Sequence, residues 1–321
     1  MHSFTQLVPL FEQRFANCLP FPSKPQSLYD PCRYLLQLGG KRIRPILCLM
    51  ANELFGEINE DAWNGASGIE LFHNFTLIHD DIMDKSPLRR GQATVHTKYG
   101  MVAGILSGDV MCLYAYKQLA NIEKYLPVAM QLFTETGIEV CEGQQLDMDY
   151  ETRDNITLAE YINMITLKTS VLLACSLKMG AILGGSLDDN ANKLYSFGKN
   201  LGIAFQLKDD YLDAYGTTEI IGKQNGGDII ANKKTYLLLK ALECANEKQK
   251  EHIETLLITN DRNKVAQMVT IYNETGAKQE CLNAVVKYSD IAFKCLEDVA
   301  LPTKRKKHLF DLATFLLQRD K

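Results

Sequence analysis

The chain has 321 residues, of which 46% are hydrophobic and 23% are charged, a profile that excludes a disordered, collagen-like or membrane-embedded protein. Its 35 basic and 39 acidic residues give a net charge of -4, so the positive field that non-specific nucleic-acid binding needs is missing, and we expect no nucleic-acid partner. The usual domain size of ~150 residues admits either two domains or one large unit.

The first residues, Met1 to Phe15, have no basic segment leading into an apolar one, so no secretory signal is indicated and we expect a cytoplasmic protein. The most apolar long stretch, Val171 to Gly185, contains Lys178 and is shorter than the ~20 residues that a membrane-spanning helix needs. We therefore expect no membrane span. The nine cysteines lie singly without a C-x-x-C pair, which predicts reduced core residues and argues against a disulfide or zinc framework.

The hydrophobic pattern is helical along most of the chain. No proline lies between Pro127 and Pro302, so helices can run uninterrupted through the second half. Apolar residues repeat at spacings of three and four in three segments: 43–54, 158–165 and 309–316. Three further predicted helices are apolar around most of their circumference, as central helices are: 68–84, 170–184 and 201–215. We predict an all-α fold with one large core, and one domain over residues 1–321.

Two segments depart from this apolar pattern. Residues 216–235 contain Gly222, Gly226 and Gly227 with several lysines and little to bury, which predicts a mobile, exposed loop. The basic run Lys304 to Lys307 is expected to form a solvated helix face, with polyanion binding as the weaker alternative.

Asp80, Asp81 and Asp84 form the first candidate site, on the helix predicted over 68–84. At about 100° per residue, Asp80 and Asp84 share one face and Asp81 lies beside Asp84. Three like charges within one turn repel each other, especially among apolar side chains, so a cation is expected there. Oxygen ligands without a cysteine or a His-x-x-x-His pair select a hard ion, Mg²⁺ or Mn²⁺, which usually completes its shell with water and substrate phosphate.

Asp209, Asp210 and Asp213 repeat this spacing on another strongly apolar helix. Either triad alone is equally well explained as an exposed acidic helix end, but two identical copies inside apolar helices weaken that explanation. Two facing carboxylate clusters imply several divalent ions, and hence a highly anionic ligand such as a diphosphate.

Basic residues lie where such a ligand needs them. They form the groups Lys41-Arg42-x-Arg44, Arg89-Arg90 and Lys168-Thr169, together with the lysines of the 216–235 segment. Any one of them alone is equally well a surface residue. With the two aspartate triads, they predict two anionic sites, one bound through metal ions and one bound directly by lysine and arginine.

In their order and spacing over nearly the whole chain, these motifs resemble the trans-isoprenyl (polyprenyl) diphosphate synthases. The motifs are Gly39-Gly40-Lys41-Arg42-x-Arg44-Pro45, Glu70-Leu71-x-His73, Asp80-Asp81-x-x-Asp84, Arg89-Arg90-Gly91, Gly143-Gln144-x-x-Asp147, Lys168-Thr169, Phe205-Gln206-x-x-Asp209-Asp210-x-x-Asp213, Gly222-Lys223 and Asp228 before Asn232-Lys233. The resemblance implies an all-α fold of about ten core helices around a deep cavity. It also implies a homodimer and the head-to-tail condensation of isopentenyl diphosphate with dimethylallyl, geranyl or farnesyl diphosphate.

The resemblance further implies roles for individual residues. The main Mg²⁺ ligands look like Asp80, Asp84 and Asp209, with Asp81 and Asp213 completing the clusters. The allylic diphosphate would be held by Arg89, Asp147, Lys168, Thr169, Gln206, Lys223 and Lys233. Isopentenyl diphosphate would be held by Lys41, Arg44, His73 and Arg90. Ionisation of the allylic substrate is then assigned to Asp80, Asp84, Arg89, Lys168, Asp209 and Lys223.

The position of His73 has independent support, because it lies seven residues before Asp80 and so on nearly the same helix face. Two other functions fit part of the pattern. A class I terpene cyclase shares the first aspartate motif but replaces the second, and a silent partner subunit would have lost an aspartate. Both motifs are intact here and the pair Lys41 and Arg44 is present, which favours condensation.

Phe75 lies five residues before Asp80, where the resemblance places the residue that limits product length, because a bulky aromatic there goes with short products. On an ideal helix Phe75 is about 140° from Asp80 whereas Thr76 is only about 40° away, so Phe75 is alternatively a core residue that packs sideways. Thr76 is not aromatic and the first motif has no inserted residue. The pattern is therefore closest to the geranylgeranyl (C20) synthases, with the farnesyl (C15) synthases next.

Overall fold

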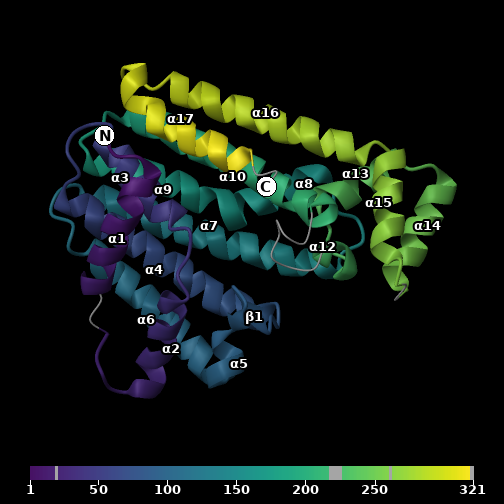
Figure 1. Ribbon diagram of the computed structural model, residues 1–321, viewed down its shortest axis with the longest axis horizontal. Helices are drawn as coiled ribbons and strands as arrows, with labels where there is room; N and C mark the ends of the chain where they lie inside the picture. Colours follow the sequence, from purple (N-terminus) through teal and green to yellow (C-terminus); the bar gives the residue numbers. More distant parts are fainter. Residues whose placement is uncertain (19–20, 217–225, 260–261, 319–321) are drawn as a thin grey trace. The chain divides into compact units, whose positions relative to one another are not determined.

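The computed structural model describes residues 1–18, 21–216, 226–259 and 262–318, and almost all of its regular structure is helical (Figure 1). In chain order the elements are α1 (Phe4–Cys18), α2 (Gln26–Gln37), α3 (Ile43–Glu53), α4 (Glu60–Met83), β1 (Leu88–Arg89), β2 (Gln92–Ala93), α5 (Val95–Tyr99), α6 (Met101–Leu119), α7 (Leu126–Thr152), α8 (Leu158–Ile165), the π-helical turn η1 (Thr166–Ser170), α9 (Val171–Leu183), α10 (Asp188–Tyr215), α12 (Gly227–Ile230), α13 (Tyr236–Cys244), α14 (Glu247–Ile258), α15 (Lys264–Glu274), α16 (Ala277–Glu297) and α17 (Thr303–Leu317). The predicted all-α fold is confirmed.

The described helices form two compact units. Unit 1 consists of residues 1–133, 176–192 and 304–308, and unit 2 consists of residues 134–175, 193–303 and 309–321. The boundaries fall inside α7, α9, α10 and α17, whereas separate domains are usually joined by exposed linkers. One domain over residues 1–321 stays a prediction.

Unit 1 is organised around α4, which lies beside α6 and also packs on α3 (Figure 1). The helix starts after Asn59, whose side chain accepts a hydrogen bond from the backbone N–H of Ala62 and so satisfies one of the unpaired donors of the first turn. Ile69 and Leu71 of α4 and Leu47 of α3 are fully or almost fully buried. Their burial fixes the middle of α4 in the core and places the first aspartate triad at its C-terminal end.

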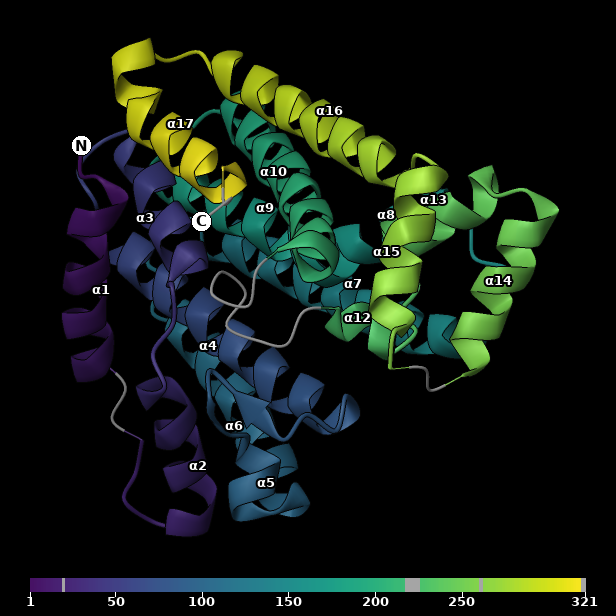
Figure 2. The ribbon, with the colours of Figure 1, turned by 45° about the vertical axis from the view of Figure 1, so that its right-hand side comes forward.

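Unit 2 contains two clusters of buried side chains. In one, Leu237 of α13 and Met268 of α15 pack with the C-terminal end of α10; in the other, Tyr161 of α8 and Leu207 of α10 pack with α16. α15 contacts α12, α14 and α16, and Figure 2 shows α14 beside α15. These contacts bury the apolar faces of α10 around the second aspartate triad.

One segment of the described residues, Leu158–Leu183, is long and apolar enough to cross a membrane by length and composition alone. In the structure, 78% of its most apolar window is buried inside the protein, as in the core helices of soluble proteins. This burial agrees with the expectation that the segment packs in the core.

The segment 216–235 is more ordered than its composition predicts. Residues 227–230 form α12, and Ile229 is buried, so the prediction of an exposed loop is wrong for this part. The cause lies in the partners of Asn232, whose side chain donates to the carbonyl of Leu257 and accepts from Lys264 Nζ over 2.6 Å. Residues 217–225, including Lys223, lie outside the described residues.

Two predictions about side-chain burial need correction. Cys141 and Cys244 are exposed rather than buried, because they lie on the outer faces of their helices, although no disulfide joins any of the described cysteines. In the basic run, Lys306 is buried and Arg305 reaches the carbonyl of Glu53 over 3.5 Å. The run therefore forms a solvated face only at its other two residues, because α17 turns its middle toward the protein.

Candidate active site

A β-hairpin folds back onto the first aspartate triad. Its two strands are joined by Arg90 and Gly91, both in the left-handed backbone region (φ 54 and 74), as a tight two-residue turn requires. Glycine adopts this conformation without strain. The hairpin brings Arg89 to α4, where its Nε and Nη2 each donate to an oxygen of Asp81 over 2.8 Å, and Nη2 lies 4.0 Å from Asp80 Oδ2. The sequence pattern did not indicate this hairpin.

The three aspartates of this triad differ in exposure. Asp81 is 1% exposed, Asp80 is half-buried, and Asp84, the residue that caps α4, is exposed. Because the C-terminal end of a helix carries partial negative charge, three carboxylates there create a strongly negative site. Asp81 is thus held by both Nε and Nη2 of Arg89, whereas Asp80 and Asp84 are more accessible at the end of the helix. The structure gives Asp81 a further role, which is to anchor Arg89.

The second triad lies near the C-terminal end of α10, and its middle aspartate is also buried. Asp210 accepts hydrogen bonds from the hydroxyl of Tyr161, from Gln206 Nε2 over 3.2 Å and from the backbone N–H of Tyr236 over 3.4 Å. Burial, reinforced by the negative charge of Asp228, raises the pKa of Asp210 to about 7, although these three hydrogen bonds act in the opposite direction. Neutral donors therefore hold a buried acid at the centre of this triad.

The outer aspartates of the second triad, Asp209 and Asp213, are half-buried. Asp213 accepts hydrogen bonds from two backbone N–H groups, that of Gly226 at its carbonyl and that of Asp228 at Oδ2, over 2.8 and 2.9 Å. It thereby fixes the start of α12. Lys233, which follows α12, lies with Nζ 3.9 Å from Asp228 Oδ1, so this lysine is held near the triad.

Lys168 and Thr169 lie in the π-helical turn η1, a local geometry that is frequent at functional sites. Gly143 of α7 makes room for it, because a Cβ atom there would lie 2.2 Å from the backbone nitrogen of Lys168. Lys168 Nζ donates to Asp147 Oδ2 over 2.6 Å, and Thr169 Oγ1 donates to Gln206 Oε1 over 3.4 Å. Four of the residues predicted for the allylic diphosphate thus lie together in unit 2.

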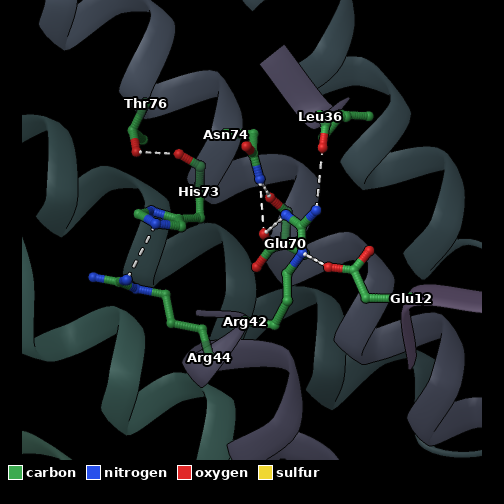
Figure 3. A network of polar contacts seen from close by, with 8 residues as sticks. All are labelled: Glu12, Leu36, Arg42, Arg44, Glu70, His73, Asn74 and Thr76. Atoms are coloured by element: carbon green, nitrogen blue, oxygen red, sulfur yellow. Dashed lines mark hydrogen bonds and ion pairs between the residues drawn. The ribbon is translucent and has the colours of Figure 1, made fainter. Parts of the chain in front are cut away.

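Two of the residues predicted for isopentenyl diphosphate, Arg44 and His73, meet in unit 1, where the start of α3 faces α4 (Figure 3). Arg44 Nη1 donates to His73 Nε2 over 3.2 Å. Because a guanidinium group can only donate, this nitrogen of His73 accepts and the ring is neutral. Burial lowers the pKa of His73 well below its ordinary value, and the charges of Arg44 and Arg90 lower it further.

Arg44 has an unsatisfied donor in this cluster. Its Nε is buried and has no hydrogen-bond partner among the described residues. Burial lowers the pKa of Arg44 to about 10, while the negative charge of Glu70 opposes that shift. Close by, the guanidinium group of Arg90 lies against Gly40, where a Cβ atom would be 3.0 Å from Nη2. A buried cation with an unused donor beside a second arginine favours binding of an anion.

Lys41 is exposed at the rim of the same loop. Three residues of the motif region adopt left-handed backbone although they are not glycine, namely Arg42, Arg90 and Asn232, with φ between 50 and 55. Such conformations cost about 1–3 kcal/mol each and cluster at functional sites. The backbone is therefore strained next to the predicted anion-binding residues.

Several residues that support the site were not predicted from the sequence. Glu70 is buried and accepts hydrogen bonds from Arg42, while Tyr161 holds Asp210 from another helix. A signal for Glu70 exists in the sequence, because it is the only charged residue between Gly65 and His79 in a helix that is otherwise apolar there. A buried charge needs a partner, so such a position predicts an ion pair.

Phe75 belongs to a row of aromatic rings along α4. Its ring lies edge-on to Phe72 and to His79, with centroids 5.3 and 4.9 Å apart. His79 fills the space left by Gly108 of α6, where a Cβ atom would lie 2.2 Å from its Nε2. Both ring partners of Phe75 lie on α4 itself, and Phe75 is half-buried. The hydroxyl of Thr76 donates to the backbone carbonyl three residues earlier. A role of either residue in product length stays a prediction.

Among the described residues, no three histidine, cysteine or carboxylate side chains are arranged to hold a metal ion by themselves. Mg²⁺ rarely uses such a cage, because it usually binds one or two carboxylates together with water and substrate phosphates. The pairs Asp80 with Asp84 and Asp209 with Asp213 each offer oxygen donors one helical turn apart. This donor set fits magnesium.

Known proteins similar to this chain carry related functions. A sequence profile described as "Polyprenyl synthetase" matches residues 25–275. The chain is 43% identical over 225 residues to a geranylgeranyl diphosphate synthase of Methanosarcina mazei, covering 69% of each chain. It is 37% identical over 298 residues to a short chain isoprenyl diphosphate synthase of Methanothermobacter thermautotrophicus, covering 92% of this chain and 91% of that one. The crystal structure of a geranylgeranyl pyrophosphate synthase matches with a TM-score of 0.94 at 41% identity, covering 100% of both chains.

Proposed function

The chain belongs to the polyprenyl synthetase family, and from this premise we propose that it extends allylic diphosphates with isopentenyl diphosphate to geranylgeranyl diphosphate (C20). It is a short-chain prenyltransferase. The names of its relatives support the C20 product, and farnesyl diphosphate (C15) is the alternative. A cytoplasmic location stays a prediction.

The observation that carries this proposal is the cationic cluster of unit 1, in which Arg44 keeps an unused, buried Nε donor beside neutral His73. A condensing enzyme binds two diphosphates, whereas a terpene cyclase binds one. The cluster would bind an anion through protein donors, without a metal ion, and so differs in kind from the aspartate triads. Both triads are intact, which argues against a silent partner subunit.

The chemistry follows from these groups. Magnesium, or manganese in its place, would be held by Asp80, Asp84, Asp209 and Asp213 and would supply positive charge that stabilises a departing diphosphate. The allylic diphosphate would be held by Arg89, Lys168, Lys223 and Lys233, with Asp147, Thr169 and Gln206 orienting the cationic side chains. Such stabilisation is realised mainly in the transition state, when the C1–O bond of the allylic substrate breaks and negative charge develops on the diphosphate.

Isopentenyl diphosphate would be held by Lys41, Arg44, His73 and Arg90. Its double bond attacks C1 of the allylic cation, and the proton lost from the product passes to the released diphosphate. No protein base is therefore required. Apolar side chains of the core helices exclude water, which would otherwise capture the cation.

A second copy of this chain is the partner we propose for an exposed apolar face of α6. Five large apolar side chains lie on this face, each at least 42% exposed: Met101, Val102, Ile105, Leu106 and Leu113. Their helical spacing produces a stripe that can pack against the same stripe of another molecule about a two-fold axis. Sedimentation velocity is expected to show a dimer, and Leu106→Glu with Leu113→Glu is expected to give monomers. A wild-type monomer at micromolar concentration would contradict this part of the proposal.

The function is tested by incubating the full chain with labelled isopentenyl diphosphate and dimethylallyl, geranyl or farnesyl diphosphate in turn, with and without Mg²⁺. Chromatography of the products is expected to show C20 as the main product and no product without the metal. Absence of condensation with every primer would refute the proposed function.

Product length is tested separately at Phe75. Phe75→Ala opens space beside Phe72 and is expected to shift the products to C25 and longer, whereas Phe75→Tyr keeps an aromatic ring and is expected to keep C20. If Phe75→Ala retains the product distribution of the wild type, another residue limits the chain length.

A further inference from the structure

Arg42 is a buried arginine directly before α3, and its side chain points away from that of Arg44 (Figure 3). It is 4% exposed and caps the start of α3 with a left-handed backbone. Its Nη1 donates to Glu70 over 2.5 Å, its Nε to Glu12 over 2.7 Å and its Nη2 to the carbonyl of Leu36 over 3.2 Å. Each nitrogen of the guanidinium group is thus engaged with the protein, which leaves this arginine poorly suited to bind a substrate.

Glu70 is the central partner in this network. It is 3% exposed, and the same oxygen that accepts from Arg42 also accepts from Asn74 Nδ2 over 2.9 Å. Burial favours the neutral form of Arg42, but the charge of Glu70 and the hydrogen bonds of both glutamates outweigh it and raise the pKa of Arg42. The charged form of Arg42 is thus favoured inside the protein by the carboxylates that it contacts.

Two contacts join the same two helices side by side. Arg42 and Arg44 are two residues apart at the start of α3, while Glu70 and His73 are three residues apart on α4, so Arg42–Glu70 lies next to Arg44–His73 (Figure 3). The first contact contains an anion and engages every nitrogen of the Arg42 guanidinium group, although Oδ1 of Asn74, which also contacts Glu70, is buried without a partner among the described residues. The second contact lacks an anion and contains the unused Nε of Arg44. The ion pair thus fixes the start of α3 next to a buried donor that is not used.

Stability alone is a weak reason for such a pair. Removing two charges from water costs several kcal/mol, and apolar side chains of similar size often give equal or greater stability. A buried ion pair is nevertheless directional, because a guanidinium group meets a carboxylate only in a narrow range of geometries. Its negative member also offsets the repulsion among Arg42, Arg44 and Arg90.

We propose that Arg42 and Glu70 form a positioning pair for the isopentenyl diphosphate site, which holds Arg44 opposite His73 without touching the substrate. This inference rests on the proposed function. It assigns a role to Arg42, the residue of the Lys41-Arg42-x-Arg44 motif that has no place among the substrate ligands.

The first test compares Glu70→Gln with Glu60→Gln in the full chain. Glu60 pairs with Arg14 and also joins α4 to α1, but it is largely exposed and lies at the other end of α4, so it is a matched control. Glu70→Gln is expected to raise KM for isopentenyl diphosphate about tenfold or more, while KM for the allylic diphosphate stays within about twofold. Glu60→Gln is expected to change neither. Equal changes in both KM values, or no change, would overturn the inference.

A double variant separates positioning from stability. Arg42→Met combined with Glu70→Gln removes both charges, so its melting temperature is expected to exceed that of either single variant. Its KM for isopentenyl diphosphate is expected to stay raised about tenfold, because the directional contact is still missing. A KM that returns to the wild-type value together with the melting temperature would show that the pair is only structural.

If a variant that removes a charge does not fold, two milder variants test the same inference. Arg42→Lys keeps the charge but loses the three-way contact, and Glu12→Gln weakens only the outer, 41% exposed partner. Both are expected to raise KM selectively for isopentenyl diphosphate, Arg42→Lys the more. Unselective changes would again overturn the inference. Absence of condensation by the wild type would instead refute the proposed function, and this inference with it.

Discussion

In the triad of α4, the buried middle aspartate is held by a cation, because Arg89 donates two hydrogen bonds to Asp81. In the triad of α10, the buried middle aspartate is held by neutral groups, because the described contacts of Asp210 are with the Tyr161 hydroxyl, an amide side chain and a backbone N–H. The spacing of the two triads is nevertheless identical. Spacing therefore decides which carboxylates share a helix face, while distant residues decide how each charge is compensated.

The middle positions of the two triads differ in how the buried charge is compensated. A cation beside a buried carboxylate offsets most of its desolvation cost, whereas neutral donors offset only part of it, in line with the raised pKa of Asp210, about 7. The first aspartates of the two triads, Asp80 and Asp209, are both half-buried, whereas the last ones differ, because Asp84 is exposed and Asp213 is half-buried. We therefore expect the triads to be alike in function at their first aspartates and unlike in stability at their middle ones.

The largest effect is expected from substitutions of the first aspartate in each triad. Asp80→Asn and Asp209→Asn are each expected to lower kcat by about 10³-fold or more, because each removes an anionic metal ligand that stabilises the departing diphosphate. The melting temperature without metal is expected to stay unchanged or to rise, since like-charge repulsion is relieved. Steady-state rates at saturating substrates and thermal melts measure the two effects.

Asp149→Asn provides the control, because Asp149 is an exposed carboxylate of α7 that contacts only Gln145 among its described side-chain partners. It is expected to leave kcat within about twofold of the wild type. Near-normal turnover by either Asp80→Asn or Asp209→Asn would show that the two triads are not functionally equivalent, despite their equal spacing.

A smaller effect is expected to separate the anion sites of the two units. Arg44→Ala is expected to raise KM for isopentenyl diphosphate about 10- to 100-fold, because it removes the arginine of the unit 1 cluster whose Nε is free to bind an anion. Lys168→Ala is expected to slow ionisation of the allylic substrate by a similar factor, because Lys168 is proposed to hold the allylic diphosphate. This lysine and its partner Asp147 belong to unit 2. Initial rates with each substrate varied in turn, and single turnovers of the allylic substrate, measure these effects. Equal effects of both variants on both substrates would refute the division.

The sequence predicted the helices and both triads, because their signals are local: apolar periodicity and repeated carboxylates within one turn. It did not predict the Arg89–Arg90 hairpin, because strands of two residues leave no alternation, and the left-handed backbone of Arg90 is not encoded in its residue type. The Tyr161–Asp210 contact joins residues 49 positions apart, so only tertiary packing determines it. For the same reason, the sequence around Gly143 did not indicate that η1 approaches this glycine.

The smallest effect is expected on stability, from substitutions of the middle aspartates. Asparagine there replaces a carboxylate with an amide of equal size. At Asp81 the new NH₂ group faces one nitrogen of the Arg89 guanidinium group, which can only donate, so one of the two hydrogen bonds is lost and the charge opposite Arg89 is removed. We expect Asp81→Asn to lower the free energy of unfolding by about 1–3 kcal/mol. Arg89 is 22% exposed, so water compensates part of the loss.

At Asp210 the same substitution meets a hydroxyl group, and Tyr161 can accept a hydrogen bond as well as donate one, so the NH₂ group of an asparagine finds a partner. The substitution also removes a buried charge for which no cation lies among the described contacts. Asp210→Asn is therefore expected to raise the free energy of unfolding by about 0–1 kcal/mol, opposite in sign to Asp81→Asn. Denaturant titrations of both variants at neutral pH without metal measure the difference. Equal destabilisation by the two substitutions would contradict this expectation. It would mean that the charge of the neighbouring group, cationic at Asp81 and neutral at Asp210, does not decide how a buried aspartate affects stability here.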